Sequence, residues 1–362
     1  MPTDSLQRSA RTATLPGIGR DGIALLVSAR VLVLGAGGLG SPVIQYLAAT
    51  GVGTLGIVDF DRVDLTNLQR QVIHSTASVE MLKTASAAAF VRAMTDQVTV
   101  VEHPVTLDRD NAIELFSGYD IIVDGTDNFA TRYLAADAAA ILGKPYVWGS
   151  VQQFDGEVTV FWETGGDGAI DYRDLHPVPP PADTVLSCAD GGVLGSLCGT
   201  IGTWMATEVV KLVTGIGTPL IGRLVHLDAL SGDVMTIAVR RADGRVPVTA
   251  LMDDYPAFCG TAATAGHDRG VSLDALPDLA PFDLVDVREP DEHAAGHLPG
   301  DTLVPLAMVV GAPRRPDGRR VVFYCETDAR SRVACAAAAA AGDDAYFLLG
   351  GYRATLAGSP RR

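Results

Sequence analysis

Short apolar runs alternate with helical patterns along the first part of the chain. The run Val-Leu-Val-Leu at 31–34 leads through glycines into a helix expected at 41–50, which the segment Gly51-Val-Gly53 ends. A second apolar strand is expected at 55–59. A strand, a helix and a second strand at this spacing form a βαβ unit, which predicts a parallel sheet.

The same alternation continues for the next two hundred residues. Further helices are expected at 78–94, 130–143 and 191–214, further strands at 98–101, 121–123 and 146–148, and a strand pair within 225–240. Strands and helices that alternate in this way are typical of an α/β fold with helices on both faces of the sheet. The segment that begins at Val158 has a less regular pattern.

A second, smaller α/β pattern follows a weakly patterned stretch. The segment Gly-Thr-Ala-Ala-Thr-Ala-Gly at 260–266 has the composition of a flexible linker. Strands are then expected at 282–287 and 321–325, and an alanine-rich helix at 331–341. We therefore expect two α/β domains, 1–250 and 272–362, joined by a linker at 251–271.

Composition narrows the class of protein. The chain has 362 residues, of which 48% are hydrophobic, and a formal net charge of −15. Such a chain can bury two cores, and its charge argues against nucleic acid or an anionic membrane as a partner. We expect no signal peptide behind Arg8 and Arg11 and no membrane span, since no apolar run of about 18 residues occurs. The five cysteines are not closely paired, which favours a reducing compartment, the cytoplasm.

A glycine-rich segment, Gly35-Ala-Gly-Gly-Leu-Gly40, occupies the first turn between strand and helix. Glycines let the backbone approach phosphates, and the helix N-terminus favours an anion. Asp59 ends the second strand 24 residues after Gly35, where a carboxylate can accept a hydrogen bond from a ribose hydroxyl. These features alone also fit an NAD-dependent dehydrogenase or a plain tight turn.

The run from Val58 to Gln71 changes that interpretation, because it adds further acids, Asn67 and Arg70. Lys83 in the next helix and Asp127 after a later strand supply a cation for phosphates and an acid for Mg²⁺. Taken singly, Lys83 would be a solvated residue and Asp127 the N-cap of the following helix. Taken together, these residues suit a metal-bound triphosphate better than a nicotinamide.

Five motifs then occur in a familiar order. They are Gly-x-Gly-Gly-Leu-Gly, Asp-Phe-Asp-x-Val-Asp, Asn-Leu-x-Arg-Gln, a lysine at 83, and Asp-Gly-Thr-Asp-Asn at 124–128. Over about residues 8–240 this set resembles the ubiquitin-activating-enzyme superfamily, and within it the bacterial MoeB/ThiF branch. The resemblance implies a Rossmann-like adenylating domain that uses ATP and Mg²⁺.

The resemblance also implies roles for individual residues. Mg-ATP would be bound by Gly38, Asp59, Asp61, Asn67, Arg70, Lys83, Asp127 and Asn128, with Asp127 on the metal. Arg11 would be an arginine finger that reaches the nucleotide of a partner subunit in a homodimer. The segment Arg8-Ser-Ala-Arg-Thr12 lacks the family's Tyr and Gln, and Glu80-Met-Leu-Lys83 replaces Gly-x-Pro-Lys.

The implied substrate is the C-terminal glycine of a ubiquitin-like sulfur carrier protein of the MoaD, ThiS or CysO kind. A carboxylate oxygen attacks the α-phosphate of ATP, pyrophosphate leaves, and an acyl adenylate forms. The protein has to position and neutralise two anions, which arginine, lysine and Mg²⁺ can do.

The family's structural zinc is not expected. Its two Cys-x-x-Cys pairs would fall at 171–174 and 256–259, where only Cys259 is a cysteine. The segment 172–177, with the prolines that follow it, resembles the actinobacterial MoeZ type, which has the same replacement.

The C-terminal region contains a second set of motifs. Asp286-Val-Arg-Glu-Pro-Asp-Glu-His293, Gly296-His-Leu-Pro-Gly300, Cys325-Glu-Thr-Asp-Ala-Arg-Ser331 and Gly350-Gly351 resemble a rhodanese domain over about 272–355. The resemblance makes Cys325 the sulfur carrier in a loop between strand and helix, where backbone N–H groups can hold a persulfide anion. In a Cys-x₅-Arg phosphatase an arginine would occupy position 331, which is serine here.

The loop departs from the usual Cys-Lys-Thr-Gly-Val-Arg-Ser, because Glu326 and Asp328 replace lysine and glycine. Acids near the sulfur disfavour its anionic form. This predicts weak activity with free thiosulfate and a preference for a protein persulfide, such as that of a cysteine desulfurase. A rhodanese-like domain that serves only for docking, with Cys325 an ordinary buried cysteine, is the alternative.

Cys188 lies in the loop Ser187-Cys-Ala-Asp-Gly-Gly192, before a helix. The resemblance implies that it attacks the adenylate or resolves an acyl disulfide, and a structural loop cysteine is the alternative. Cys198 and Cys335 lie in helical stretches and are expected in the cores. The full expectation is adenylation of the carrier, attack by a Cys325 persulfide, and release of a thiocarboxylate, for a molybdopterin, thiamin or cysteine pathway.

Overall fold

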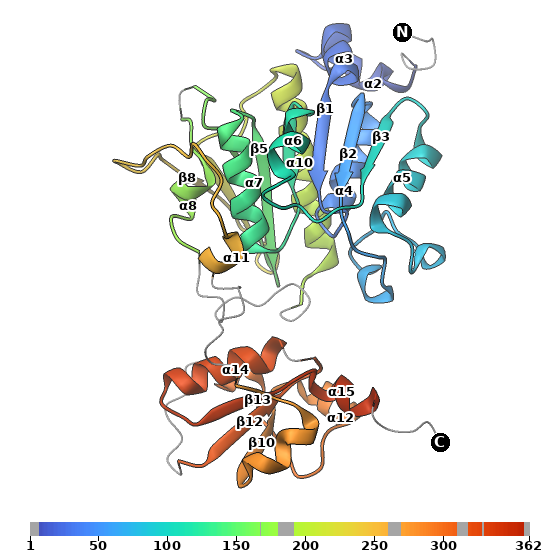
Figure 1. Cartoon of the computed structure of the whole chain (residues 1–362). Helices are drawn as coiled ribbons and strands as arrows, with labels where there is room; N and C mark the ends of the chain where they lie inside the picture. Colours follow the sequence, from blue (N-terminus) through green and yellow to red (C-terminus); the bar gives the residue numbers. More distant parts are fainter. Residues whose placement is uncertain are drawn as a thin grey trace. The chain divides into compact units, whose positions relative to one another are not determined.

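The computed structural model describes residues 7–166, 168–179, 192–259, 269–309, 318–327 and 329–357. The chain divides into two compact units (Figure 1). The described part of the first comprises residues up to 179 and 192–258, and the second continues from Cys259. Each unit is described by itself.

The first unit is built on an eight-stranded sheet of order β3-β2-β1-β4-β5-β6-β7-β8. Its strands are β1 (Arg30–Leu34), β2 (Thr54–Val58), β3 (Thr99–His103), β4 (Ile121–Asp124), β5 (Tyr146–Gln152), β6 (Asp155–Phe161), β7 (Arg223–Asp228) and β8 (Val234–Ala238). In this order, neighbouring strands from β3 through β2, β1 and β4 to β5 are parallel. Neighbouring strands from β5 to β8 are antiparallel. The strand order reverses between β1 and β4, where open α/β sheets bind their ligands.

Helices surround this sheet. They are α2 (Ala10–Ala13), α3 (Gly19–Ser28), α4 (Gly40–Thr50), α5 (Lys83–Met94), α6 (Ala112–Ser117), α7 (Phe129–Ile141), α8 (Tyr172–Leu175), α10 (Gly195–Thr214) and α11 (Tyr255–Phe258), with 3₁₀ turns η1 (Leu65–Asn67) and η2 (Thr76–Ser78). Residues 31–34 of β1 are fully buried, and side chains of α4 and α10 belong to the same apolar core. The predicted Rossmann-like α/β fold is therefore confirmed.

Two expected elements differ from the structure. The helix expected at 78–94 begins only at Lys83, because Glu80 has a φ of +70°, a left-handed conformation that ends a right-handed helix. The less regular segment from Val158 is the end of strand β6, which pairs with β5 and β7. The alternation that marks a half-buried strand is weak there, since residues 158–161 are all buried.

Residues 251–258 belong to the first unit rather than to a linker. Tyr255 in α11 is buried, and its hydroxyl donates a hydrogen bond to Asp137 Oδ2 at 2.8 Å. Arg173 holds the same carboxylate at 2.8 and 2.9 Å. The first compact unit thus extends through Phe258, into the segment predicted as a linker.

The second unit is a five-stranded parallel sheet of order β11-β10-β12-β13-β9. Its strands are β9 (Gly270–Val271), β10 (Phe282–Asp286), β11 (Thr302–Leu303), β12 (Arg320–Tyr324) and β13 (Ala345–Leu348), and its helices are η3 (Leu273–Leu279), α12 (Pro290–Ala295), α13 (Leu306–Val309), α14 (Ala329–Ala340) and α15 (Gly351–Ala357). A small α/β domain was expected here, and the structure confirms it.

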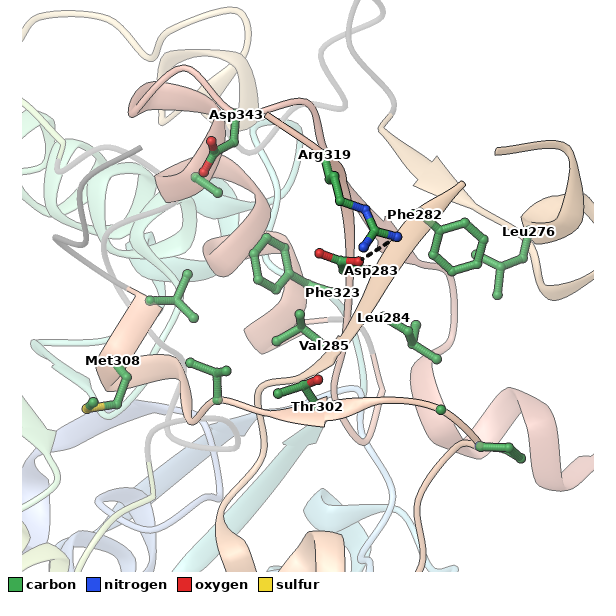
Figure 2. Close-up of a pocket in the computed structure, with 15 residues that line it drawn as sticks. Leu276, Phe282, Asp283, Leu284, Val285, Thr302, Met308, Arg319, Phe323 and Asp343 are labelled. Atoms are coloured by element: carbon green, nitrogen blue, oxygen red, sulfur yellow. Dashed lines mark ion pairs between the residues drawn. The ribbon is translucent and has the colours of Figure 1, made fainter. Parts of the chain in front are cut away.

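A cavity of about 700 Å³ lies in the second unit, beside β10 and β12 (Figure 2). Its walls are mainly apolar, with Phe282, Leu284 and Phe323 among them, and Arg319 forms an ion pair with Asp283 at 3.1 Å. None of the predicted site residues lines it. Across the described parts of both units, no helix is long and apolar enough to cross a membrane.

Candidate active site

The glycine loop joins β1 to α4 in a turn that only glycines can form. Gly35 has a φ of +85°, and a Cβ atom on Gly40 would lie 1.8 Å from the carbonyl oxygen of Gly35. The backbone of the loop therefore lies bare at the carboxyl edge of the sheet, in front of the N-terminus of α4. This is the arrangement in which helix N-termini bind phosphate.

Asp59 fixes this loop to the end of β2. Its carboxylate accepts hydrogen bonds from the N–H of Ala36 at 2.8 Å and from the N–H of Asp61 at 2.9 Å. Burial raises the pKa of Asp59, and the nearby Lys83 ammonium opposes that rise. The residue predicted to bind a ribose thus also holds the phosphate loop in place.

Lys83 is the first residue of α5 and lies at the same edge. Its Nζ is 2.8 Å from Asp61 Oδ2, and its N–H donates to the carbonyl of Asp61 at 2.9 Å. The structure therefore brings together Asp59, Asp61 and Lys83, as predicted for a shared site. It also shows that the ammonium is paired with an acid of the same site rather than solvated.

His74 is a buried residue of this region that the sequence analysis missed. Its Nε2 lies 2.9 Å from the carbonyl oxygen of Ala36, and its Nδ1 lies 2.8 Å from Ser86 Oγ. Burial lowers the pKa of His74, as does the Lys83 ammonium. A neutral His74 therefore links the glycine loop to α5. Its position just after the motif ending at Gln71 is the only sequence signal for it.

Arg70 and Gln71 border the other side of the loop. A Cβ atom on Gly38 would lie 3.5 Å from Cγ and Cδ of Arg70, and one on Gly37 would lie 3.7 Å from Gln71 Nε2. Gln71 is buried, and its Oε1 has no hydrogen-bond partner among the residues described. Both side chains therefore reach the glycine loop. Gln71 is a second residue of this region, after His74, that was not among the predicted ligands of Mg-ATP.

Asn67 has a structural role in the turn that carries Arg70. Its Oδ1 accepts the N–H of Asp64 at 3.0 Å, while Asp64 Oδ1 accepts the N–H of Thr66 at 2.8 Å. This reciprocal capping fixes the 3₁₀ turn η1. The Arg70 guanidinium donates back to the carbonyl of Thr66 at 3.3 Å.

The loop after β4 packs against the glycine loop. A Cβ atom on Gly125 would lie 3.0 Å from the backbone nitrogen of Gly40. Asp127 follows two residues later with an exposed side chain. Asn128, rather than Asp127, caps α7, and its side chain accepts the N–H of Thr131 at 3.2 Å. The N-cap alternative for Asp127 is therefore wrong.

Asp124 and Arg132 fix this loop through hydrogen bonds to the backbone of Thr126. Asp124 is fully buried and accepts hydrogen bonds from the N–H of Thr126 at 2.8 Å and from the hydroxyl of Tyr146. Burial raises its pKa. Arg132 donates twice to the carbonyl of Thr126, at 3.0 and 2.7 Å. Asp124 belongs to the motif at 124–128, but no role is predicted from the sequence for either residue.

Two other predicted residues are not tested by this arrangement. Arg11 lies on α2 and is exposed, and Arg8 beside it donates to the carbonyl of Met94 at 3.0 Å, which ties this segment to the end of α5. The arginine-finger role of Arg11 stays a prediction. Cys188 lies outside the described residues.

The positions of the family's first cysteine pair form an ionic cluster. The Arg245 guanidinium pairs with Asp171, with Asp174 at 2.8 Å and with Glu163 at 2.6 Å, and all four side chains are largely buried. Burial raises the pKa of Asp171, and Arg245 opposes this. Whether the chain lacks zinc of the thiolate type stays a prediction.

Cys325 follows β12 at the start of the predicted loop and precedes α14. It is 1% exposed, and its Sγ lies 3.7 Å from Ser331 Oγ. Its carbonyl accepts the N–H of Tyr352 at 2.8 Å, and a Cβ atom on Gly351 would lie 2.4 Å from that carbonyl oxygen. The predicted Gly-Gly segment therefore packs directly on the cysteine loop.

The charge of Glu326 is offset within this loop. Its carboxylate pairs with Arg288 at 3.1 Å and with Arg353 at 3.2 Å. Arg330 turns toward α12 and holds both oxygens of Glu292 at 2.7 Å, which helps to lower the pKa of Glu292. The expected effect of acids on the sulfur therefore depends on Asp328, which lies outside the described residues.

A phosphate-binding turn with an acid, a lysine and an arginine at one sheet edge defines the first unit as a nucleotide-binding domain. In the second unit Cys325 lies between β12 and α14, where the sequence predicts a sulfur-handling loop. The chain belongs to the ThiF family: the model of that family matches residues 9–248, and the model of the rhodanese-like domain matches residues 272–357. The resemblance drawn from the sequence is thus confirmed.

Relatives share this two-part organisation. The chain is 46% identical over 361 residues to "Probable adenylyltransferase/sulfurtransferase MoeZ" of Mycobacterium tuberculosis, which covers 96% of this chain and 92% of that protein. It is 41% identical to "Adenylyltransferase and sulfurtransferase MOCS3" of Bos taurus over 82% of this chain and 65% of that one. It is 45% identical to "Sulfur carrier protein adenylyltransferase" of Thermus thermophilus over 71% and 97%.

Solved structures agree on the fold of the first unit. MccB of E. coli with ATP superposes with a TM-score of 0.58 at 18% identity, covering 69% of this chain and 75% of that chain. PaaA superposes with a TM-score of 0.55 at 20% identity, covering 66% and 75%. At this level of identity the likeness concerns the fold alone.

Proposed function

We propose that this chain adenylates the C-terminal glycine of a ubiquitin-like sulfur carrier protein with ATP and then transfers sulfur to it. One observation carries the first half: the bare glycine loop, Asp59, Lys83 and Arg70 surround one edge of the sheet. Asp61 and Asn67 support them by orienting Lys83 and the turn of Arg70. An NAD-dependent dehydrogenase needs only the glycine loop and Asp59, so the further charged residues Asp61, Arg70 and Lys83 favour ATP.

ATP binds in this proposal with its phosphates over the loop. Gly38 leaves room beneath them, and Asp59 receives the ribose. Lys83 and Arg70 neutralise charge on the phosphates, since guanidinium and ammonium groups stabilise the developing negative charge. The buried oxygen of Gln71, unpaired among the described atoms, offers an acceptor to a nucleotide N–H group.

Mg²⁺ fits the exposed carboxylate of Asp127, which lies in the loop after β4 with Asn128 next to it. One or two carboxylates together with substrate phosphates are its usual ligands, and the ion would supply charge neutralisation and orientation of the phosphates. In our proposal Arg11 reaches the nucleotide of the partner subunit in a homodimer.

Sulfur transfer starts from the acyl adenylate. The terminal sulfur of a Cys325 persulfide attacks the carbonyl carbon of the acyl adenylate, the bond to the AMP oxygen breaks, and AMP leaves. The resulting acyl disulfide accepts two electrons from a thiolate, for which Cys188 is our candidate. The carrier leaves as a thiocarboxylate, and the Cys325–Cys188 disulfide must then be reduced by an external dithiol.

The persulfide itself needs a donor. We propose either thiosulfate or the persulfide of a cysteine desulfurase, in the cytoplasm, where the thiols stay reduced. Because Cys325 is 1% exposed, the loop that holds it has to open before a donor protein can reach its sulfur.

The same burial favours one alternative, a rhodanese-like unit that only docks the carrier or its donor. ATP–pyrophosphate exchange that depends on a carrier ending in Gly-Gly tests the adenylation half. Mass spectrometry of the carrier then tests the second half: Cys325→Ala should abolish the thiocarboxylate and leave exchange intact. Full thiocarboxylate output from Cys325→Ala would establish the docking role instead.

A further inference from the structure

Three side chains that can bind a metal meet in the second unit, apart from the Cys325 loop. His293 lies in α12, His297 just after it, and Asp301 just before β11. Nε2 of His293 is 3.4 Å from the Asp301 carboxylate, and Nδ1 of His297 is 3.0 Å from Asp301 Oδ1. The three donor atoms all lie within 4.8 Å of one another.

These distances are close to those of a filled site. Zinc binds imidazole nitrogen and carboxylate oxygen at about 2.0–2.2 Å in a tetrahedron, which places ligand atoms roughly 3.3–3.5 Å apart. The His293 distance of 3.4 Å matches that spacing, and the His297 distance of 3.0 Å is somewhat shorter. Each nitrogen therefore already lies near the carboxylate, and what has to change on binding is the orientation of one ring.

The donor set selects among cations. Two imidazoles and one carboxylate suit first-row transition metals, whereas Mg²⁺ and Ca²⁺ prefer oxygen ligands alone. Three protein ligands with a fourth position open is the pattern of reactive rather than structural zinc. The site shares no residue with the positions of the family's thiolate zinc, 171, 174, 256 and 259.

The carboxylate is held in place before any ion binds. Asp301 is 2% exposed on its side chain, its Oδ2 accepts the hydroxyl of Tyr324, and that hydroxyl accepts the N–H of Leu298 at 3.0 Å. Such outer contacts orient metal ligands in known sites.

The two rings are parallel, with centroids 4.1 Å apart and planes inclined by 15°. Lone pairs of stacked rings do not converge on one point, so one ring has to turn about its Cβ–Cγ bond. His297 can do so, because its side chain is 47% exposed, whereas His293 is 22% exposed.

We propose that His293, His297 and Asp301 bind one Zn²⁺ per chain, with a fourth position open to water or to a thiolate. The proposal does not depend on the adenylation or sulfur-transfer activity. Tyr324 connects the site to the cysteine loop, since it donates to Asp301 and directly precedes Cys325.

The test uses the full chain, stripped with a chelator and titrated with Zn²⁺ in a calorimeter. One zinc ion per chain should bind at this site, and His297→Gln and Asp301→Asn should each weaken its affinity at least 10-fold. Tyr324→Phe, which removes only the outer contact, should weaken it by about 10-fold. His297 is exposed, so its variant should fold even if the Asp301 variant does not, and circular dichroism checks this.

His226→Gln is the matched control, because that imidazole also lies beside two carboxylates, Asp155 at 3.4 Å and Glu157 at 3.6 Å, but in the first unit. The His226→Gln variant should bind zinc with the same affinity as the wild type. Equal affinity of the wild type and His297→Gln would overturn the proposal, as would an equal loss in His226→Gln.

Co²⁺ substitution separates this site from the cysteines. A site with two imidazoles and one carboxylate gives d–d bands without a thiolate-to-cobalt charge-transfer band. A strong near-ultraviolet charge-transfer band that disappears in Cys325→Ala, with d–d bands unaffected by His297→Gln, would assign the metal to cysteine and refute the proposal.

Discussion

Lys83 and Asp61 form an ion pair at the edge of the glycine loop, with Nζ 2.8 Å from Oδ2. Their side chains differ in exposure, 9% for the lysine and 49% for the aspartate. The carboxylate therefore holds a nearly buried ammonium in one orientation at the edge of the proposed site. Both residues were expected to bind the nucleotide, and their pairing defines distinct tasks for them.

Replacing Lys83 should therefore lower the rate of adenylation strongly and change the free energy of unfolding little. Lys83→Met should lower carrier-dependent ATP–pyrophosphate exchange by about 10²–10³-fold, the effect of losing one preorganised charge stabiliser. Asp61→Asn, which leaves the ammonium in place but less well aimed, should lower it by less. Lys144→Met is the control, because Lys144 lies before β5, at the opposite edge of the parallel strands. Equal loss in both lysine variants would argue against a role in catalysis.

The Arg245 cluster should dominate the stability of the first unit's C-terminal segment. Removing Arg245 leaves three largely buried carboxylates uncompensated, so Arg245→Met should lower the free energy of unfolding by about 3–5 kcal/mol. Arg241 pairs with Glu163 too, but its own side chain is exposed, so Arg241→Met should cost about 0–1 kcal/mol. Urea denaturation followed by tryptophan fluorescence measures this, since all three tryptophans, at 148, 162 and 204, lie in this unit.

His176 should make the first unit sensitive to mild acid. Burial, together with the Arg132 guanidinium, lowers the pKa of His176 to about 4, and its ring packs on Tyr172 with centroids 4.7 Å apart. A base whose folded pKa is lowered takes up a proton more readily when unfolded. Its stabilising effect is therefore full above about pH 6.5 and is lost as the pH falls toward 4, at no more than about 1.4 kcal/mol per pH unit.

The measurement is the difference in unfolding free energy between wild type and His176→Gln at several pH values. That difference should shrink as the pH falls from 7 to 4.5. Comparing the two proteins cancels the titration of the other buried acids. A difference that stays constant over this interval would show that His176 does not change its charge on folding.

The cysteine loop allows a prediction about which acid matters. Glu326 is paired with two arginines, so Glu326→Gln should change the thiosulfate:cyanide sulfurtransferase rate by less than about 3-fold, as expected for an acid whose charge is already offset. Asp328→Gly should raise that rate more than Glu326→Gln does. The reverse order would mean that Arg288 and Arg353 do not offset Glu326 in solution. A wild-type rate equal to that of a Glu326→Lys, Asp328→Gly double variant would contradict the predicted weak activity.

The sequence predicted the parallel strands and the edge that carries Asp59, because apolar runs and their spacing are local signals. It did not predict what depends on distant residues. Arg245 reaches Asp171 and Glu163 across 74 and 82 positions, and no periodicity marks such a pair. The late start of α5 depends on the backbone of Glu80, whose left-handed conformation no residue type dictates.

The site was predicted as a set of ligands, and the structure separates that set into two kinds. Arg70 lies against Gly38 of the loop and Lys83 pairs with Asp61, whereas Asn67 mainly caps a turn. His74 was missed because a single histidine in an irregular segment carries no pattern. Asp124 was missed because a buried acid is recognised only once its partners are known.

The cluster of Arg245 with Asp171, Asp174 and Glu163 ties the segment after β8 to the body of the first unit through nitrogen and oxygen alone. A metal held by four thiolates in the same place would be open to persulfidation and oxidation by the very sulfur species that such a protein handles. A guanidinium clasp is chemically inert to them. The contacts of this cluster therefore depend neither on the redox state of a thiol nor on the supply of zinc.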